Sequence, residues 1–189
     1  MSYVERRRFL WILFLIGVAL TGAVAAVGTT LVAMPFEELA TRATAVARLR
    51  CVGTHSFVED GEIWTETQFE TVAAHKGLLG KLVVVRMPGG KANGLHTRVD
   101  GVPEFAMGEE VYLFLWTGRD GGLRVLGWTQ GTFRIQRDER TGNETVTQDS
   151  SNGAVFDAKT KTFRREGIRE MSVAKFEEKL RAALANREN

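Results

Sequence analysis

Apolar and polar residues alternate with a period of two along the chain beyond residue 43. Between 43 and 58, one face of this alternation is mainly apolar and consists of Ala45, Ala47, Leu49, Cys51 and Phe57. The other face is polar and consists of Arg48, Arg50, Thr54 and Ser56. A period of two with one polar face is typical of a half-buried β-strand. The alternation resumes after the turn signal Asp60-Gly61, so the sequence predicts a long antiparallel hairpin.

Five shorter segments of strand-like composition follow, at 82–88, 111–116, 123–128, 132–137 and 144–148. The connection between the first two of them, 92–110, is long and polar, and 150–167 is only weakly patterned. The segment 111–116 is apolar on both faces, with Val111, Leu113 and Leu115 on one and Tyr112, Phe114 and Trp116 on the other. Such a strand must be covered on both sides. We therefore expect it at the centre of the fold, with another element packed over its outer face.

Helical signals occur near both ends of the domain. Pro35, followed by two glutamates, suits the first turn of a short helix at 35–41. Ser172 suits an N-cap, and it precedes an apolar stripe at helical spacing formed by Val173, Phe176, Leu180 and Leu184. This second helix is the candidate cover for the central strand. The elements together predict a mainly β fold, a small antiparallel OB-like barrel with a short N-terminal and a C-terminal helix, in one domain over 29–189.

A hydrophobic segment precedes this domain. Three arginines, Arg6 to Arg8, come first, and no charge follows until Glu37. The length of the uncharged run is typical of a membrane anchor, whereas its dense apolar start and small-residue end are typical of a cleaved signal peptide. Cleavage would follow Ala25 or Gly28, so residues 1–28 are a signal peptide or a membrane anchor. If uncleaved, the chain contacts the membrane only through residues 9–33.

Both interpretations of this segment place the domain on the same side of the membrane. Arginines before an apolar run stay in the cytoplasm, so we expect an exported protein, either periplasmic or extracellular, or anchored to the inner membrane. The single cysteine, Cys51, excludes an internal disulfide. An exported domain of this size without disulfides is more typical of a bacterial envelope than of eukaryotic secretion.

Charge argues against nucleic acid as a partner. The formal net charge of +2 comes from the segment before Ala26, whose removal takes 25 basic residues to 22 and 23 acidic residues to 22. A neutral domain lacks the basic surface that nucleic-acid binding requires. We therefore expect another envelope protein, and no nucleic acid, as the partner.

No sequence motif for catalysis is present. Cys51, His55 and His75 could form a metal cluster, because the first two share strand parity and His75 is near the end of the paired strand. Cys51, however, lies on the apolar face, where a free cysteine is normally a small core residue. Neither a zinc-binding spacing nor a nucleophile motif occurs. We expect no catalytic residue, no metal and no cofactor.

Two places are candidates for binding. The long connection 92–110 carries Asn93, His96, Arg98 and Phe105, and long connections in compact domains are often binding loops. Trp64 lies at a polar-face position of its strand, where it is either an exposed contact residue or packed under the C-terminal segment.

The order of these segments resembles that of a group of uncharacterised exported bacterial proteins. The resemblance rests on "CVGTHSFV", "ETQFETVAAHKG", "LVVVRMPGG", "GVPEFAMGEEVYLFL" and "LRVLGWTQGTFRI", and it covers roughly Thr44 to Arg137. Its motifs, such as Lys76-Gly77 and Gly108-Glu109, imply turns and core. The pattern is in turn similar to the OB-type barrel of netrin-like domains and tissue inhibitors of metalloproteinases. Those inhibitors depend on an N-terminal cysteine and several disulfides, so their mechanism does not carry over to a chain whose one cysteine is Cys51.

These observations favour an exported, non-enzymatic binding or interaction protein of the bacterial envelope. A membrane-anchored accessory subunit of a larger complex, with the barrel outside, is the first alternative. A metal-binding protein or enzyme with a cryptic site is the second.

Overall fold

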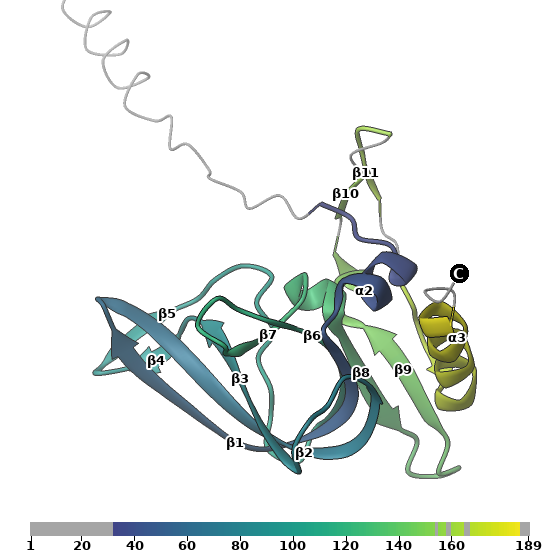
Figure 1. Cartoon of the computed structure of the whole chain (residues 1–189), viewed down its shortest axis with the longest axis horizontal. Helices are drawn as coiled ribbons and strands as arrows, with labels where there is room; N and C mark the ends of the chain where they lie inside the picture. The colour runs from purple at the N-terminus through teal and green to yellow at the C-terminus, as the bar shows by residue number, and fades with distance from the viewer. Residues whose placement is uncertain (1–31, 154, 158–159, 165–166, 186–189) are drawn as a thin grey trace, which may run out of the picture.

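The computed structural model describes residues 32–153, 155–157, 160–164 and 167–185, and the expected signal or anchor at 1–28 lies outside them. The fold is mainly β, with a helix near each end of the described chain (Figure 1). The helices are α2 (Phe36–Arg42) and α3 (Val173–Ala185). The strands are β1 (Ala45–Glu59), β2 (Glu62–Lys76), β3 (Leu82–Pro88), β4 (Gly90–Ala92), β5 (Leu95–Thr97), β6 (Glu110–Thr117), β7 (Leu123–Val125), β8 (Thr132–Arg137), β9 (Glu144–Gln148), β10 (Val155–Asp157), β11 (Thr162–Arg164) and β12 (Met171–Ser172). No helix of the described chain is long and apolar enough to cross a membrane.

Most strands belong to one large sheet that is partly closed into a ring. Its order is β1-β2-β3-β7-β6-β8-β9-β12, and β6 also pairs with β1, so β1, β2, β3, β7 and β6 form the ring. β3 and β7 pair in parallel, through Val85 and Leu123, whereas the other pairs are antiparallel. The prediction of a purely antiparallel sheet is therefore wrong. β6 and β7 form an antiparallel hairpin. This hairpin fixes the direction of β7, which therefore runs parallel to β3.

The pairing of β1 with β6 closes the ring. Ala45 pairs with Leu115 and Arg50 with Glu110 at the two ends of this pairing. The guanidinium groups of Arg48 and Arg50 both bind the Glu110 carboxylate, each with an Nη2–Oε distance of 2.5 Å. The first residue of β6 is thus held between two arginines of β1.

The hairpin of β1 and β2 confirms the predicted turn. Asp60 and Gly61 connect the strands with φ values of 52° and 80°, the left-handed conformations that an Asp-Gly hairpin turn requires. Lys76 and Gly77 end β2 and act as structural residues. Lys76 Nζ donates hydrogen bonds of 2.6 and 3.0 Å to the carbonyls of Ala40 and Thr41 at the end of α2.

A β-bulge divides β1 into two halves with different side-chain parity. Cys51 pairs with Phe69 and Gly53 with Gln68, so Val52 is an extra residue in β1. A bulge shifts the following side chains to the opposite faces. The prediction that Phe57 and His55 share a face with Cys51 is therefore wrong. Thr54 and Ser56 take the inner face, opposite Thr67 and Thr65 of β2.

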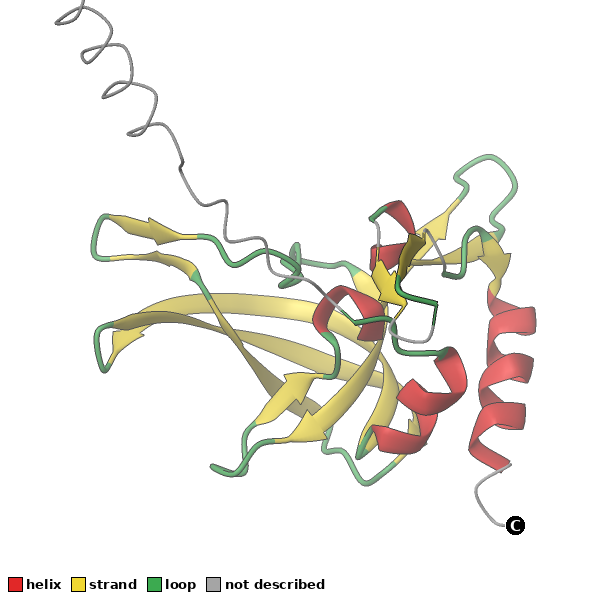
Figure 2. Cartoon of the chain, turned by 90° about the horizontal axis from the view of Figure 1, so that it is seen from above, coloured by secondary structure: helices red, strands yellow, loops and turns green. Residues whose placement is uncertain are grey.

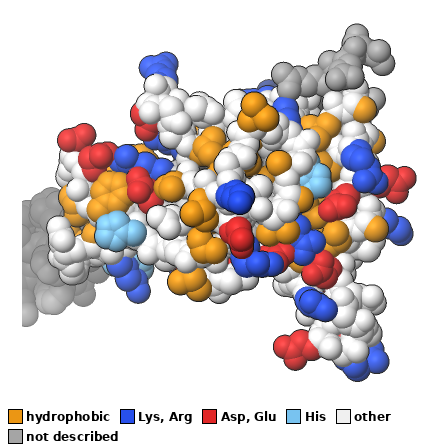
Figure 3. All heavy atoms as spheres, turned by 60° about the horizontal axis from the view of Figure 1, so that its bottom comes forward, with side chains coloured by type: hydrophobic (Ala, Val, Ile, Leu, Met, Phe, Trp, Pro, Cys, Tyr) orange, Lys and Arg blue, Asp and Glu red, His pale blue; other side chains and the backbone are white. Residues whose placement is uncertain are grey.

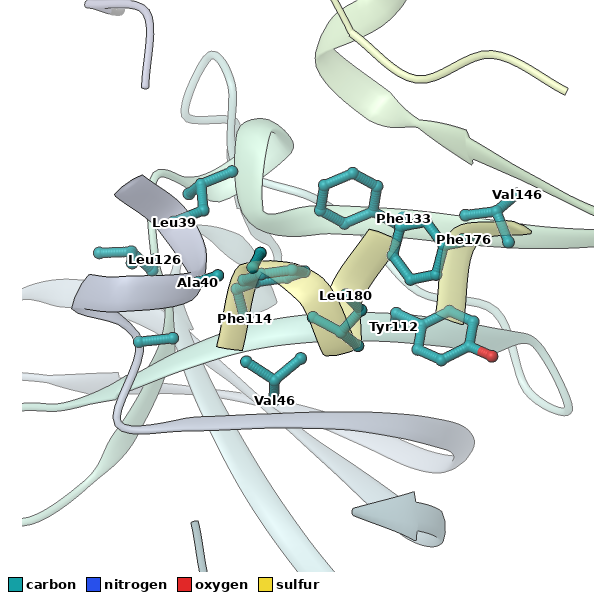
Figure 4. Close-up of a cluster of buried hydrophobic side chains, with 12 residues drawn as sticks. Leu39, Ala40, Val46, Tyr112, Phe114, Leu126, Phe133, Val146, Phe176 and Leu180 are labelled. Carbon is teal, nitrogen blue, oxygen red and sulfur yellow. The ribbon is translucent and has the colours of Figure 1, made fainter. Parts of the chain in front are cut away.

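Two hydrophobic cores lie on opposite sides of β6. The core inside the ring is built around Val111, Leu113 and Leu115, together with Ala45, Ala47, Leu49, Cys51, Phe69, Val83, Val85, Met87 and Val125. The core outside the ring is built around Tyr112 and Phe114, together with Leu39, Val46, Phe133, Val146, Phe176 and Leu180 (Figure 4). α3 supplies Phe176 and Leu180, so the prediction that this helix covers the central strand is confirmed. Trp116 is the exception, because its side chain remains 39% exposed beyond the reach of α3.

The remaining differences from prediction arise at turns. Gly127 and Trp128 have φ values of 62° and 53°, and they end β7 at Val125 before a 3₁₀ turn at Trp128–Gly131, so the predicted strand at 123–128 is too long. The connection 92–110 begins with a hairpin, β4–β5, that turns at Asn93-Gly94. The Asn-Gly pair is a strong hairpin signal. The weakly patterned segment 150–167 likewise contains the hairpin β10–β11.

Candidate functional site: a groove lined by hydroxyl groups

A groove of about 300 Å³ lies between the distal half of the β1–β2 hairpin and the segment that follows β3. Figures 1 and 2 show the β4–β5 hairpin beside the tip of the β1–β2 hairpin. The floor is formed by Thr54, Ser56, Thr65, Thr67 and Met87, and the opposite wall by 88–91, 96–99 and 102–105. This volume is at the lower end of the range for small-molecule sites. The groove can therefore hold a small ligand or a single residue of a larger partner.

Hydrogen bonds fix two of the floor hydroxyls. Thr65 Oγ1 donates to the Gly89 carbonyl at 2.6 Å and lies 2.8 Å from Ser56 Oγ. Because the Thr65 proton points at Gly89, Ser56 is the donor in the second bond, and its lone pairs remain available as acceptors. Gly90 lies directly against this pair, where a Cβ atom would collide with both hydroxyl groups.

The other two floor hydroxyls have no such partners. Thr67 is only 4% exposed, and within the described chain neither its hydroxyl nor that of Thr54 forms a hydrogen bond. The two residues pair across β1 and β2. Thr54 is exposed, and the Thr67 hydroxyl opens on the groove rather than into the core. This pair therefore offers unused donors and acceptors to a ligand in the groove.

Two cationic side chains and a histidine lie at the opening. Lys91, His96 and Arg98 line the groove and are exposed, and Glu104 is the one acidic residue of the lining. Neither Lys91 nor Arg98 forms an ion pair with a described residue. On the face seen in Figure 3, by contrast, acidic and basic side chains are interspersed among hydrophobic ones.

Arg134 of β8 holds the wall segment in place. Its Nε and Nη2 donate hydrogen bonds of 2.6 and 2.8 Å to the two oxygens of Asp149, and Nη2 donates at 3.0 Å to the Glu104 carbonyl. Arg134 also binds the Glu109 carboxylate, and its guanidinium carbon lies 5.6 Å from the centroid of Phe105. Burial raises the pKa of the Asp149 carboxyl group, against the opposing effect of Arg134. The arginine thus joins both ends of 104–109 to the sheet.

Backbone bonds complete this attachment. Gly108 N donates to the Cys51 carbonyl at 2.8 Å, and Cys51 N donates to the Glu109 carbonyl at 2.9 Å. Phe105 packs edge-on against Phe69 of the inner core, with ring centroids 5.1 Å apart. The wall is therefore preformed rather than a loose loop, and Gly108-Glu109 acts structurally.

The structure brings together three of the five predicted binding residues. His96, Arg98 and Phe105 line the groove, whereas Asn93 lies at the exposed tip of the β4–β5 hairpin. Trp64 lies on the outer face of β2, where the Arg86 guanidinium covers its ring at 4.6 Å. Trp64 is half-buried and packs against Arg86, so its role as a contact residue stays a prediction.

Sequence reasoning missed the floor of the groove. The sequence pattern does not single out Thr65 and Thr67, and it places Thr54 and Ser56 on the polar face of their strand, whereas all four line the groove. The signal that could have revealed them is the run of hydroxyl residues at alternate positions on both arms of the hairpin. A threonine-rich inner face is unusual beside a hydrophobic core, and it indicates a solvent-facing cavity.

The three residues of the hypothetical metal cluster lie apart. Cys51 is 1% exposed in the inner core, as predicted for a core cysteine, and burial raises the pKa of its thiol. His55 stacks on Phe57 on the outer face. The ring centroid of His75 lies 5.6 Å from that of Tyr112, and His75 is half-buried. Within the described part of the chain, no group of three or more residues could hold a metal ion.

Comparisons with protein-family models, curated proteins and solved structures found no match for this chain. The resemblance of Thr44 to Arg137 to exported bacterial proteins and netrin-like barrels therefore rests on the sequence motifs alone.

Proposed function

We propose that this is an exported, non-enzymatic binding protein of the bacterial envelope, and that the groove is its binding site. One observation carries the proposal: the Thr67 side chain is largely buried, yet its hydroxyl has no hydrogen-bond partner in the described chain and opens on a groove with a fixed wall. Preformed pockets with a few converging polar groups are typical of ligand sites. A ligand could hydrogen-bond to this hydroxyl without displacing an existing bond within the protein.

The ring of five strands supports the finer assignment to an OB-type barrel. It is closed by β1 and β6 and has one short parallel contact between β3 and β7, which suits a five-stranded, partly open barrel. The two structural motifs taken from the resemblance, Lys76-Gly77 and Gly108-Glu109, lie at attachments of this ring. They support membership of the netrin-like group as a proposal.

The floor hydroxyls are arranged for binding rather than for nucleophilic attack. A nucleophilic serine requires a base that accepts its proton. The Ser56 proton points at Thr65, whose own proton points at a backbone carbonyl. This arrangement supplies acceptors to a ligand and leaves Ser56 without activation.

Photo-crosslinking in the living cell tests the binding role. A photoreactive amino acid replaces Thr97 at the groove or, as a matched control, the exposed Glu139 in the distant turn between β8 and β9. We expect an added mass after irradiation for the Thr97 variant alone, measured by mass spectrometry of the purified protein. Equal adducts at both positions, or none at Thr97, would contradict a binding role for the groove.

A reporter fusion tests the compartment separately. Residues 1–34 are fused to an enzyme that is active only outside the cytoplasm. We expect activity, and we expect its loss when Arg6 to Arg8 and the apolar run after them are deleted. An inactive reporter, together with fractionation of the protein into the cytoplasm, would overturn the export proposal.

A further inference from the structure

We propose that the groove binds a small polyhydroxylated anion, one acidic sugar ring in size. This inference rests on the proposed binding function and specifies the chemistry of the ligand. Three properties of the lining support it: unpaired cations at the rim, unsatisfied hydroxyls on the floor and a short apolar surface between them.

The rim cations differ from the arginines of the ring strands. Those arginines all bind carboxylates of this chain: Arg48, Arg50, Arg86 and Arg124. Lys91 and Arg98 form no ion pair with any described residue, although both lie at the same groove. A site with two uncompensated cations and one acid favours an anionic ligand, and arginine suits the geometry of both carboxylate and phosphate.

The floor hydroxyls match a ligand that carries several hydroxyl groups. Thr54 and Thr67 can each donate and accept, whereas Ser56 is left mainly as an acceptor because its proton is engaged by Thr65. A simple anion such as acetate would satisfy the cations and leave Thr67 unpaired. A sugar hydroxyl at the floor would satisfy Thr67 while the acid group reaches the rim.

The apolar part of the lining suits the carbon face of a sugar. Met87 is buried beside Thr65, and Val102 and Phe105 line the wall. Small-molecule sites typically combine apolar walls with a few polar groups that fix orientation. At about 300 Å³, the groove is sized for one ring rather than for an extended chain.

Calorimetric titration of the full-length protein in mild detergent tests the proposal. The probes are glucuronate and glucose 6-phosphate as acidic sugars, glucose as the neutral sugar, and acetate and inorganic phosphate as simple anions. We expect at least one acidic sugar to bind about tenfold or more tightly than glucose and than the simple anion that bears its acid group. The stronger of the two acidic sugars identifies a carboxylate or a phosphate as the preferred group.

Variants assign this binding to the groove. Lys91→Ala and Arg98→Ala should each weaken the acidic sugar about three- to fivefold, and added salt should reduce these losses. Thr67→Val should weaken it about fivefold at low and high salt alike. The matched controls are Lys81→Ala and Arg119→Ala, which remove exposed, unpaired charges away from the groove and should leave the affinity within about twofold.

The outcomes separate this inference from the proposed function. Equal binding of glucose and the acidic sugars, or equal binding of acetate or phosphate, would overturn the ligand assignment and leave the groove as a binding site. Failure of all five probes would also overturn it, while the crosslinking of Thr97 would continue to report on the binding role. Tight binding that Thr67→Val and Arg98→Ala do not change, in variants that melt like the wild type, would place the ligand elsewhere.

Discussion

The two halves of the β1–β2 hairpin belong to the same strands, but their inner faces have different surroundings. Before the bulge at Val52, the inner face carries Ala45, Ala47, Leu49 and Cys51, which pack into the core. Beyond the bulge, it carries Thr54 and Ser56, which line the groove. The comparison teaches that one extra residue marks the boundary between a closed half, which packs into the core, and an open half, which lines the groove.

The largest effect should come from a charge placed in the core on which the closed half packs. Leu113 is 0% exposed at the centre of the inner core, and Leu113→Asp would bury a carboxylate without a partner. We expect a loss of several kcal/mol, enough to unfold a domain of ordinary stability, measured by urea denaturation. The matched change in the open half, Thr54→Asp, should alter the free energy of unfolding by less than about 0.5 kcal/mol. A folded Leu113→Asp protein would show that the two halves do not differ as described.

A smaller effect should follow when the wall of the open half is detached. Arg134→Ala leaves Asp149 and Glu109 without their cation, and we expect a loss of about 2 kcal/mol at neutral pH. Burial already raises the pKa of Asp149, so the protonated form of its carboxyl group favours folding, and this contribution is lost as the pH rises.

The pH dependence sharpens this test. Without Arg134, the pKa of Asp149 should rise further, so the stability gap between variant and wild type should narrow as the pH falls towards about 4. Thermal melts at several pH values measure the gap. A stability gap that widens in acid would show that the ion pair is not what holds the wall. The control is Arg137→Ala, which removes an exposed arginine from the same strand and should not produce this pH-dependent gap.

Cys51→Ala should have a modest effect. The substitution leaves a small cavity in the inner core, and we expect a loss of about 1 kcal/mol in the free energy of unfolding. Because burial raises the thiol pKa, the native protein should also react slowly with alkylating reagents. Rapid labelling of the folded wild-type protein would place Cys51 outside the closed half.

The smallest effect, with the opposite sign, should come from Thr67→Val. This change replaces a hydroxyl that opens on the groove and has no partner in the described chain with a methyl group, so the unfolding free energy should rise by less than about 0.5 kcal/mol while ligand binding weakens. Denaturation without and with ligand measures both quantities. A clear loss of stability in the absence of ligand would mean that Thr67 acts as a structural residue.

The sequence predicts the elements better than it predicts their faces. The bounds of β3 and β6, the Asp60-Gly61 turn and the stripe of α3 follow from patterns within a few residues of one another. The face of Thr54 and Ser56 depends on Val52, which becomes an extra residue only because Gly53 pairs with Gln68. A bulge is fixed by the partner strand, so alternation along one strand cannot reveal it.

For the candidate site, the sequence predicts the residues of one connection but not those that come from separate strands. His96, Arg98 and Phe105 lie in one connection, and their polarity made that connection a candidate. The hydroxyl floor comes from two strands whose relative register brings Thr54 opposite Thr67. Arg134, which fixes the wall, lies on β8, and only the tertiary fold brings it to Glu104 and Asp149.

The closure of the ring by β1 and β6 also shapes the order in which the chain can fold. Ala45 pairs with Leu115, so β1 has no partner on that side until β6 has formed, although β2 can pair with β1, and β3 with β2, through local turns. An unpaired strand edge beside apolar residues invites association with other chains. Arg48 and Arg50 lie along this edge and keep it charged in the meantime. When β6 pairs with β1, the same two arginines bind Glu110, which favours the observed register of β6. One pair of side chains therefore keeps the edge charged before pairing and stabilises the correct pairing afterwards.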